Sequence, residues 1–307
     1  MKHLFIINPV AGGMKGRISD VEQEIRTITD RLDAPYDVCM TQAPMDACRI
    51  ISETVSSEDM LYVYACGGDG TLNECVNGAA LRANVAVTQY PCGTGNDFLR
   101  MFGQNNIGKF RNLQSLTTGA VRPLDLIDCN GRYGINICSV GIDARVGADV
   151  HRYSSIPIIG GATGYVTALV VNVIKGVAQR LRITSGDLVV DKSVTLVCAC
   201  NGRFYGGGFN PVPDAIPDDG ILEFLVVDEV SRFKIAKVVG KYAKGRYREL
   251  GDIIKHIRGT NMVLESDKDL VVNVDGEIIT ARNVSFKVVP RGVNFIFPLD
   301  LDFFDSE

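Results

Sequence analysis

Gly67-Gly68-Asp69-Gly70-Thr71-Leu72-Asn73-Glu74 is the stretch that decides the fold, because it joins an apolar run at 61–65 to a segment of helical spacing at 72–81. Its glycines permit a tight turn and a close approach of the backbone to a ligand. Backbone N–H groups at a helix start form an anion site, for which polyphosphate is a natural ligand. Asp69 and a phosphate are both negatively charged, so they are favourable neighbours only when a cation lies between them. This predicts Mg²⁺ bound jointly by protein and nucleotide. The alternative is a plain turn in which Asp69 caps the helix.

On both sides of this stretch, short apolar runs alternate with amphipathic segments. Patterns typical of strands and of helices follow one another, and they predict βαβ units in a doubly wound, mostly parallel α/β sheet. The strand patterns cover 4–7, 36–40, 61–65 and 85–89, and the helical patterns cover 18–32, 47–55 and 72–81.

Polar, glycine-rich loops at 8–13, 67–71 and 91–97 follow three of these strands. Ligands of such sheets bind beyond the carboxyl ends of the strands, so we expect the three loops to converge on one edge. Two other phosphate motifs are missing. Residues 103–109 have P-loop spacing, but Phe110 replaces the Mg²⁺-binding hydroxyl, and Gly93-Thr94-Gly95 does not continue as a dinucleotide motif.

After about residue 124 the pattern changes to closely spaced strand-like runs, with helical candidates mainly at 162–173 and 233–242. Many short strands with intervening turns predict a β-sandwich or a barrel. We therefore expect an α/β domain at 1–124 and a β domain at 125–292.

Composition excludes several classes of function. The formal net charge of −4 gives no field to attract nucleic-acid phosphates, so a nucleic-acid partner is not expected. Nine cysteines without a CxxC pair favour a reducing cytoplasm. The three histidines lack metal-ligand spacing. Residues 153–174 carry no charge and are numerous enough to span a bilayer, but their glycines, proline and polar residues argue against a transmembrane helix. The segment is instead expected to form a loop followed by a buried helix, or an apolar surface beside a cleft that accepts an apolar substrate.

Motifs across the chain resemble the diacylglycerol kinase catalytic-domain family, and most closely its soluble bacterial lipid kinases. The run at 67–71 alone is shared with NAD kinases and phosphofructokinases, and its continuation to Glu74 with the later motif at 91–98 points to lipid kinases. The resemblance implies an α/β nucleotide domain and a β-sandwich with the active site in the cleft between them. It also implies that a terminal segment, 293–307, returns to the first domain. It rests on Asn8-Pro9, Ala11-Gly12, 67–74, Pro91-Cys92-Gly93-Thr94-Gly95-Asn96-Asp97-Phe98, Asn201-Gly202, Tyr205-Gly206-Gly207-Gly208, Pro213, Ala215, Asp218-Asp219-Gly220 and Asp275-Gly276-Glu277.

The resemblance also implies roles for single residues. Glu277 would accept the proton of the substrate hydroxyl, while Asp69, Asp97 and Asp125 would organise the catalytic Mg²⁺ through water. A structural Mg²⁺ would be held by Asp219 and by the backbone carbonyls of Ile216 and Ile221. The ATP contacts would fall on Asn8, Pro9, Val10, Ala11, Gly12, Thr41, Gly68, Asp69, Gly70, Thr71, Leu72, Asn73, Glu74 and Thr94.

Spacing alone leaves alternatives for these residues. Asp275-Gly276-Glu277 has the pattern of a plain hairpin turn, and Asp219-Gly220 that of an ordinary turn. The expected function is phosphoryl transfer from ATP to a hydroxyl of a lipid, most directly diacylglycerol, by a cytoplasmic protein that visits the membrane surface. An NAD kinase-like enzyme of soluble substrates and a non-catalytic nucleotide or lipid sensor remain open, and so does a homodimer.

Overall fold

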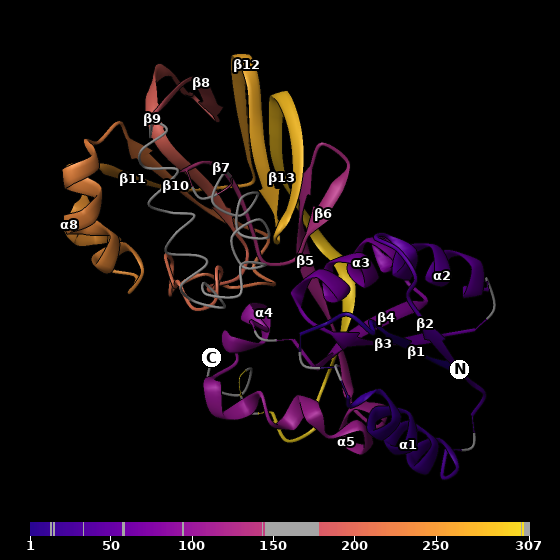
Figure 1. Cartoon of the computed structure of the whole chain (residues 1–307). Coiled ribbons are helices and arrows are strands. Elements are labelled where there is room, and N and C mark those ends of the chain that lie inside the picture. The colour runs from indigo at the N-terminus through magenta and orange to yellow at the C-terminus, as the bar shows by residue number, and fades with distance from the viewer. Residues whose placement is uncertain are drawn as a thin grey trace. The chain divides into compact units, whose positions relative to one another are not determined.

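The computed structural model describes the chain except residues 13, 15, 33, 57–58, 94, 143, 145–177, 302 and 304–307. Thr94 and the uncharged segment at 153–174, with its helical candidate at 162–173, lie outside the described residues. The chain divides into two compact units, drawn in Figure 1. Unit 1 consists of Met1–Asp125 with Pro290–Glu307, and unit 2 consists of Leu126–Val289.

Unit 1 is built on a parallel sheet with the strand order β13-β4-β3-β1-β2. Figure 1 shows α2 and α3 on one face of this sheet and α1 and α5 on the other. The alternation of strands and helices predicted for this half is confirmed. The elements are β1 (Lys2–Ile7), α1 (Ile18–Thr29), β2 (Tyr36–Met40), α2 (Asp46–Thr54), β3 (Leu61–Gly67), α3 (Asp69–Ala79), β4 (Val85–Pro91), α4 (Asp97–Arg100), η1 (Gln104–Asn106), η2 (Lys109–Arg111), α5 (Leu113–Thr117) and β5 (Ala120–Cys129).

The strands and helices of unit 1 bury the apolar side chains that predicted them. All seven residues of β4 are buried, as expected of a strand covered by helices on both faces. Val21, Ile25 and Thr29 of α1 are buried at a spacing of four residues, which gives the helix one inward face. Helix α3 begins at Asp69, three residues before the helical pattern at 72–81. Gly70 and Thr71 therefore belong to the helix although they are not part of its apolar pattern.

Unit 2 is β-rich, as predicted, and its strands pair in the order β11-β10-β9-β7-β12-β13, with β8 beside β9 and β12. The helical pattern at 233–242 corresponds to α8. The first part of β13 pairs with β12, and residues near its end pair with β4 of unit 1. The elements are β6 (Arg132–Gly134), β7 (Ile137–Gly141), β8 (Gln179–Ser185), β9 (Leu188–Cys200), β10 (Leu222–Asp228), α8 (Arg232–Tyr242), η3 (Tyr247–Leu250), β11 (Ile254–Gly259), β12 (Asn261–Val274) and β13 (Glu277–Phe297).

Two apolar clusters fill unit 2, and β9 contributes alternate residues to each. Val197 and Ala199 belong to one cluster, whereas Leu196 and Cys198 belong to the other, which also includes Tyr242 at the end of α8. Successive side chains of a strand point to opposite faces of the sheet, so β9 is covered on both faces. Across the described ranges, no helix has the length and apolar character needed to cross a membrane.

Candidate functional site

The turn from β3 into α3 requires glycine at position 67, the last residue of β3. A Cβ atom there would lie 2.2 Å from Thr71 Oγ1, so any side chain would displace the first turn of α3. The hydroxyl of Thr71 accepts a hydrogen bond from Asn8 Nδ2 at 3.0 Å. Asn8 follows β1, and the loops after β1 and β3 are therefore fixed to one another at the N-terminus of α3.

The loop after β4 packs against the same turn. The N–H of Cys92 donates to the Gly67 carbonyl at 3.0 Å, and a Cβ on Gly93 would lie 2.5 Å from the Cα of Gly68. Asn96 itself is in the left-handed conformation, with φ of 51°, and its Nδ2 donates to the Gly93 carbonyl at 2.8 Å. The expected convergence of glycine-rich loops at the strand ends is thus visible in the backbone.

The carboxylates of Asp69 and Asp97 both lie near Gly95. A Cβ at Gly95 would lie 2.8 Å from Asp69 Oδ2 and 3.9 Å from Asp97 Oδ2. Arg100 lies beside this pair, with its Nε 3.1 Å from Asp97 Oδ1 and donating to the Gly95 carbonyl at 3.1 Å. Carboxylate oxygens are the ligands that Mg²⁺ prefers, so the chemistry of this pair fits a divalent cation.

The other residues of unit 1 that were predicted to contact ATP differ in their exposure and in their hydrogen bonds. Val10 is 86% exposed, and its N–H donates to Asn8 Oδ1 at 3.1 Å. The N–H of Thr41 donates to the carbonyl of Ile7 at 2.9 Å, which places Thr41 beside the end of β1. Leu72 and Asn73 are buried, so their side chains face the interior of the unit. Pro9, Ala11 and Gly12 lie in the loop after β1, and Gly70 lies in the first turn of α3.

Glu74 has a structural contact that the sequence does not indicate. Its Oε2 accepts a hydrogen bond from the backbone N–H of Ala47 at 3.1 Å, in the first turn of α2. Three further N–H groups of that turn have no partner within the helix, so a carboxylate there stabilises the helix start. Glu74 thus connects α3 to α2.

Asp125 is almost fully buried in β5, where its Oδ1 accepts a hydrogen bond from the N–H of Arg291 at 2.7 Å. Arg291 has φ of 53°, in the left-handed region. The carboxylate therefore stabilises the backbone of β13 at an unfavourable conformation. The structure brings Asp69 and Asp97 together, and it gives Asp125 this separate contact.

Burial perturbs the pKa of groups next to the glycine loops. Desolvation raises the pKa of the Cys92 thiol to about 11, so this thiol is neutral near pH 7. Desolvation, together with a hydrogen bond to Glu24 at 2.7 Å, raises the pKa of Tyr90. Neither group is prepared to act as a nucleophile at neutral pH.

Glu277 lies in unit 2, at the start of β13, directly after a turn built on Asp275. The Asp275 carboxylate accepts three backbone hydrogen bonds, from Ile135 at 2.6 Å, Asn136 at 3.0 Å and Ile137 at 2.9 Å. The side chain of Glu277 is 42% exposed and lies 3.8 Å from Arg132. Sequence reasoning missed the role of Asp275, since its three partners are about 140 residues away in the chain.

The predicted structural metal loop includes Ile216, Asp219 and Ile221. Asp219 Oδ1 accepts from the N–H of Ile221 at 3.0 Å, and Asp219 Oδ2 accepts from Arg258 Nη2 at 3.1 Å. Arg258 also donates to Glu223 at 2.9 Å. A cation at Asp219 would therefore compete with a guanidinium that already neutralises this carboxylate. Among the described side chains, no cluster of three His, Cys, Asp or Glu could hold a metal ion.

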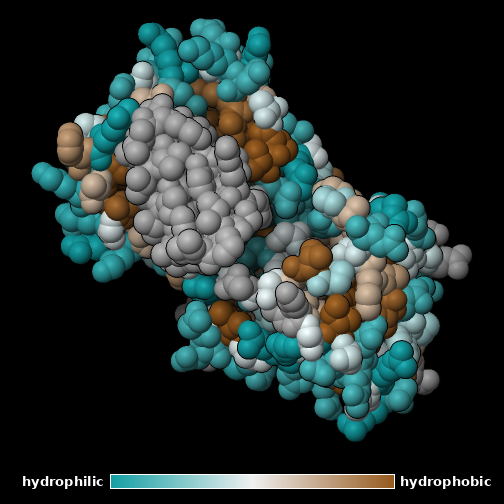
Figure 2. Space-filling view, viewed as in Figure 1, coloured by the Kyte–Doolittle hydropathy of each residue, from teal (hydrophilic) through white to brown (hydrophobic). Residues whose placement is uncertain are grey.

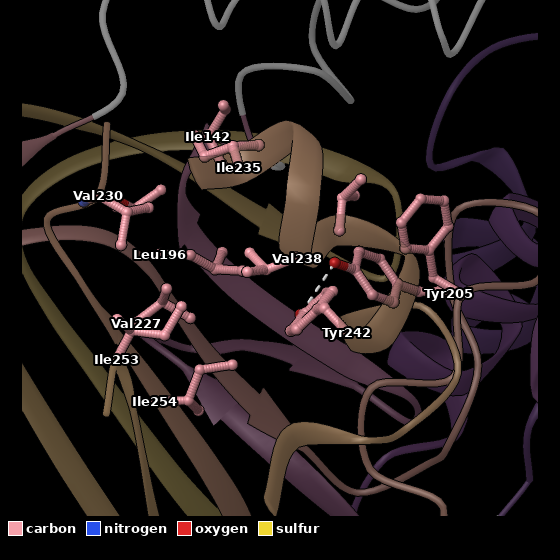
Figure 3. A pocket seen from close by; sticks show the side chains of 13 residues that line it. Ile142, Leu196, Tyr205, Val227, Val230, Ile235, Val238, Tyr242, Ile253 and Ile254 are labelled. Carbon is pink, nitrogen blue, oxygen red and sulfur yellow. Dashed lines mark hydrogen bonds between the residues drawn. The ribbon is translucent and has the colours of Figure 1, made fainter. Parts of the chain in front are cut away.

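A cavity of about 70 Å³ lies in unit 2 between the sheet and α8. Figure 3 shows aliphatic side chains pointing into it, with Tyr205 at one end. The hydroxyl groups of Tyr205 and Tyr242 are hydrogen-bonded at 3.1 Å. The cavity can take an apolar group such as the end of an alkyl chain. Its aliphatic lining includes Leu196, Val227, Ile235, Val238, Ile253 and Ile254.

Comparisons with known proteins agree with these features. A model of the diacylglycerol kinase catalytic domain matches residues 2–129. A model of the YegS C-terminal NAD kinase beta sandwich-like domain matches residues 136–297, more than half of the chain.

Individual relatives extend over most of the chain. A Staphylococcus haemolyticus protein named as a lipid kinase is 29% identical over 254 residues, which cover 82% of this chain and 81% of that protein. A Shewanella frigidimarina protein named as a YegS-like lipid kinase is 27% identical over 303 residues, covering 95% and 94%. A solved Bacillus anthracis structure described as a diacylglycerol kinase has a TM-score of 0.70 and 25% identity, and covers 96% of this chain and 98% of that one.

The resemblance predicted from the motifs is thereby confirmed. The matched models place the catalytic-domain signature on the converging loops of unit 1 and the second domain on the β-rich unit 2. The chain belongs to the YegS-like lipid kinase family, in which a diacylglycerol kinase catalytic domain is joined to a YegS C-terminal domain.

Proposed function

We propose that this protein transfers the γ-phosphoryl group of ATP to a hydroxyl of a membrane lipid, and that diacylglycerol is the acceptor and phosphatidic acid the product. The observation that carries the proposal is that the carboxylates of Asp69 and Asp97 both lie near Gly95, at the N-terminus of α3. The domain predicted at 1–124, with the segment 293–307, is then the ATP-binding domain, and the domain predicted at 125–292 is the lipid-substrate domain.

The phosphates of ATP fit the backbone around Gly68 and Gly93. These glycines pack so closely that a side chain on Gly93 is excluded. The N-terminus of α3 supplies N–H groups and the positive end of a helix dipole. Asn8, which is hydrogen-bonded to Thr71, fixes the loop after β1 beside them. A protein of net charge −4 can bind ATP in this way because backbone amides replace cationic side chains.

Asp69 and Asp97 would hold Mg²⁺ at the phosphates, and Asp125 is the third carboxylate that we assign to this cation through water. When bound, Mg²⁺ supplies neutralisation of the charge on the transferring phosphoryl group. The oxygen donors of Asp69 and Asp97, which both lie near Gly95, suit this hard cation. Arg100, 3.1 Å from Asp97, orients that carboxylate.

In the proposed reaction the lipid hydroxyl oxygen forms a bond to the γ-phosphorus, and the bond from that phosphorus to the β–γ bridging oxygen breaks. The hydroxyl proton passes to Glu277, and ADP leaves with the electron pair of the broken bond. Glu277 suits this step because its partly exposed carboxylate can receive and release a proton. The triply hydrogen-bonded Asp275 fixes the turn from which Glu277 extends.

The apolar cavity of unit 2 supports a lipid as acceptor. Its lining is aliphatic, with the paired hydroxyl groups of Tyr205 and Tyr242 at one end. Burying alkyl groups there contributes about 25 cal/mol for each Å² removed from water. A nicotinamide dinucleotide offers no comparable apolar group. Because a lipid substrate resides in a bilayer, we infer a cytoplasmic protein that associates with the membrane surface.

A transfer assay tests this function. The full chain is incubated with γ-labelled ATP, Mg²⁺ and, in parallel, diacylglycerol, phosphatidylglycerol, a sphingoid base or NAD. We expect label in the diacylglycerol product. Label in NAD alone would show an enzyme of soluble substrates, and ATP binding without transfer to any acceptor would show a sensor.

A further inference from the structure

The strongest concentration of positive charge in unit 2 lies along and just beyond α8. Between residues 232 and 248 the sequence has seven Lys and Arg and no Asp or Glu, in a chain whose net charge is −4. Such a segment attracts anionic surfaces over a distance set by the ionic strength. Figure 1 shows α8 on the outside of the strands of unit 2.

Helix α8 has two different faces. Ile235, Val238 and Tyr242 point inward and line the apolar cavity. The opposite face carries Phe233 and Lys237, both exposed, at the helical spacing of four residues. Ala236 and Gly240 of the same helix are small and also exposed.

Phe233 is 84% exposed, although an aromatic side chain of this size is normally among the first to be buried. Its chain neighbours are the cations Arg232 and Lys234. At the left edge of Figure 2, over α8, hydrophobic side chains lie among hydrophilic ones. An aromatic ring flanked by cations matches the boundary between phospholipid headgroups and acyl chains.

The cations of this segment differ in whether they have acidic partners. Lys234 pairs with Asp252, Lys241 and Arg246 pair with Glu249, and Arg248 pairs with Asp214. Within the part of the chain that the structure describes, Arg232, Lys237 and Lys244 form no ion pair, and all three are exposed. Their charge is therefore available to an external partner.

We propose that the outer face of α8 together with the turn that follows it, defined as Arg232, Phe233, Lys237 and Lys244, docks on an anionic lipid bilayer. The choice of a bilayer over an acidic protein rests on the proposed lipid substrate and on the exposed Phe233. The cations lie against lipid phosphates, and the phenyl ring enters the headgroup boundary. The inner face of the same helix lines the apolar cavity, so docking places the cavity one helix diameter from the membrane.

Vesicle sedimentation tests this surface without any phosphoryl transfer. The full chain, without ATP, is mixed with vesicles of phosphatidylcholine alone or with added phosphatidylglycerol. We expect binding only to the anionic vesicles, with affinity falling as salt is raised. The variant R232Q/K237Q/K244Q should bind about 100-fold more weakly, at about fivefold for each cation removed. Phe233→Ala should weaken binding about tenfold.

The matched control is K255Q/K268Q/K287Q, which removes three exposed lysines of unit 2 from β11, β12 and β13. It changes the net charge equally, so we expect its vesicle binding to remain within about twofold of wild type. Equal losses in the two triple variants, or no loss in the α8 variant, would overturn the proposal. So would a wild-type dimer that the α8 variant cannot form, because the face would then bind a second copy.

An assay with diacylglycerol in uncharged detergent micelles separates this proposal from the proposed function. The α8 triple variant should retain wild-type transfer there, since no anionic surface is involved, and an unchanged melting temperature shows that it folds. A chain that binds anionic vesicles through α8 but phosphorylates no lipid in micelles would contradict the proposed function and still support this surface.

Discussion

Asp275 and Ile137 are joined by two reciprocal hydrogen bonds. The N–H of Ile137 donates to Asp275 Oδ1 at 2.9 Å, and the N–H of Asp275 donates to the carbonyl of Ile137 at 3.2 Å. Asp275 has φ of 52°, a left-handed conformation that Asp tolerates better than most residues. The pair fixes the turn between β12 and β13 onto β7, and Glu277 extends from that turn.

Substitution of Asp275 should therefore reduce both stability and transfer. Asp275→Ala leaves three backbone N–H groups without their acceptor, and we expect a loss of about 3 kcal/mol in the free energy of unfolding. Asp275→Asn retains one acceptor oxygen and should lose less. Urea unfolding measures the difference, and equal stability of wild type and Asp275→Ala would show that this carboxylate does not stabilise the turn.

Glu277→Gln should separate activity from stability. The side chain is 42% exposed, so we expect its unfolding free energy to stay within about 0.5 kcal/mol of wild type. Loss of the proton acceptor should lower kcat by about 10² to 10⁴ with little change in the KM for ATP. A variant with wild-type kcat would remove Glu277 from the proposed mechanism.

Gly93→Ala tests the close packing of the two glycine loops. The new Cβ would lie 2.5 Å from the Cα of Gly68, so one loop must move, at an expected cost of about 2 kcal/mol in stability. The KM for ATP should rise, because the phosphate-binding backbone moves with the loop. Gly108→Ala is the matched control. Gly108 has φ of −60° and no atom within 4 Å of its added Cβ, so it should change neither stability nor KM.

Arg258 should compete with a cation for Asp219, because its Nη2 donates to Asp219 Oδ2 at 3.1 Å. We expect Mg²⁺, in the absence of ATP, to raise the melting temperature of Arg258→Met at lower concentrations than it does for wild type. Sodium chloride of equal ionic strength is the control. Identical Mg²⁺ titrations for the two proteins would argue against a metal at Asp219.

Stability should fall at alkaline pH through Cys92. Burial raises the pKa of this thiol in the folded protein from 9.0 to about 11, so above pH 9 the unfolded chain releases its proton more readily. The buried, protonated thiol makes its full contribution to the free energy of unfolding below pH 9. This contribution, about 2 to 3 kcal/mol, is lost as the pH rises to about 11. Unfolding at pH 8.5 and 10.5 should show a smaller loss for Cys92→Ala. Equal losses in both proteins would contradict this.

The part of the fold that follows from local pattern could be predicted from the sequence. Apolar runs and helical spacing gave the alternating first half and the strand-rich second half, because burial imposes periods of about 2 and 3.6 on a chain. The glycine loop at 67–71 could be placed between a strand and a helix for the same reason. The pattern predicts the start of this helix at 72 rather than at Asp69, because Gly70 and Thr71 carry no helical signal.

Contacts between distant residues could not be predicted. Glu74 accepts from Ala47, Arg258 donates to Asp219, and Asp275 accepts from residues near 136, and no local periodicity encodes such pairs. The two faces of α8 show the same limit. Its helical pattern was evident, but which face meets the cavity depends on Leu196 of β9, about 40 residues earlier.

The most direct test of the account is label transfer from γ-labelled ATP to diacylglycerol in detergent micelles, compared between wild type and Asp69→Asn. Asp69 lies with Asp97 beside Gly95, and loss of its charge should weaken the hold on Mg²⁺. We expect labelled phosphatidic acid from wild type and a decrease of at least about 10³-fold in the variant, at unchanged melting temperature. Equal transfer by both proteins, or label that enters no lipid, would contradict the account.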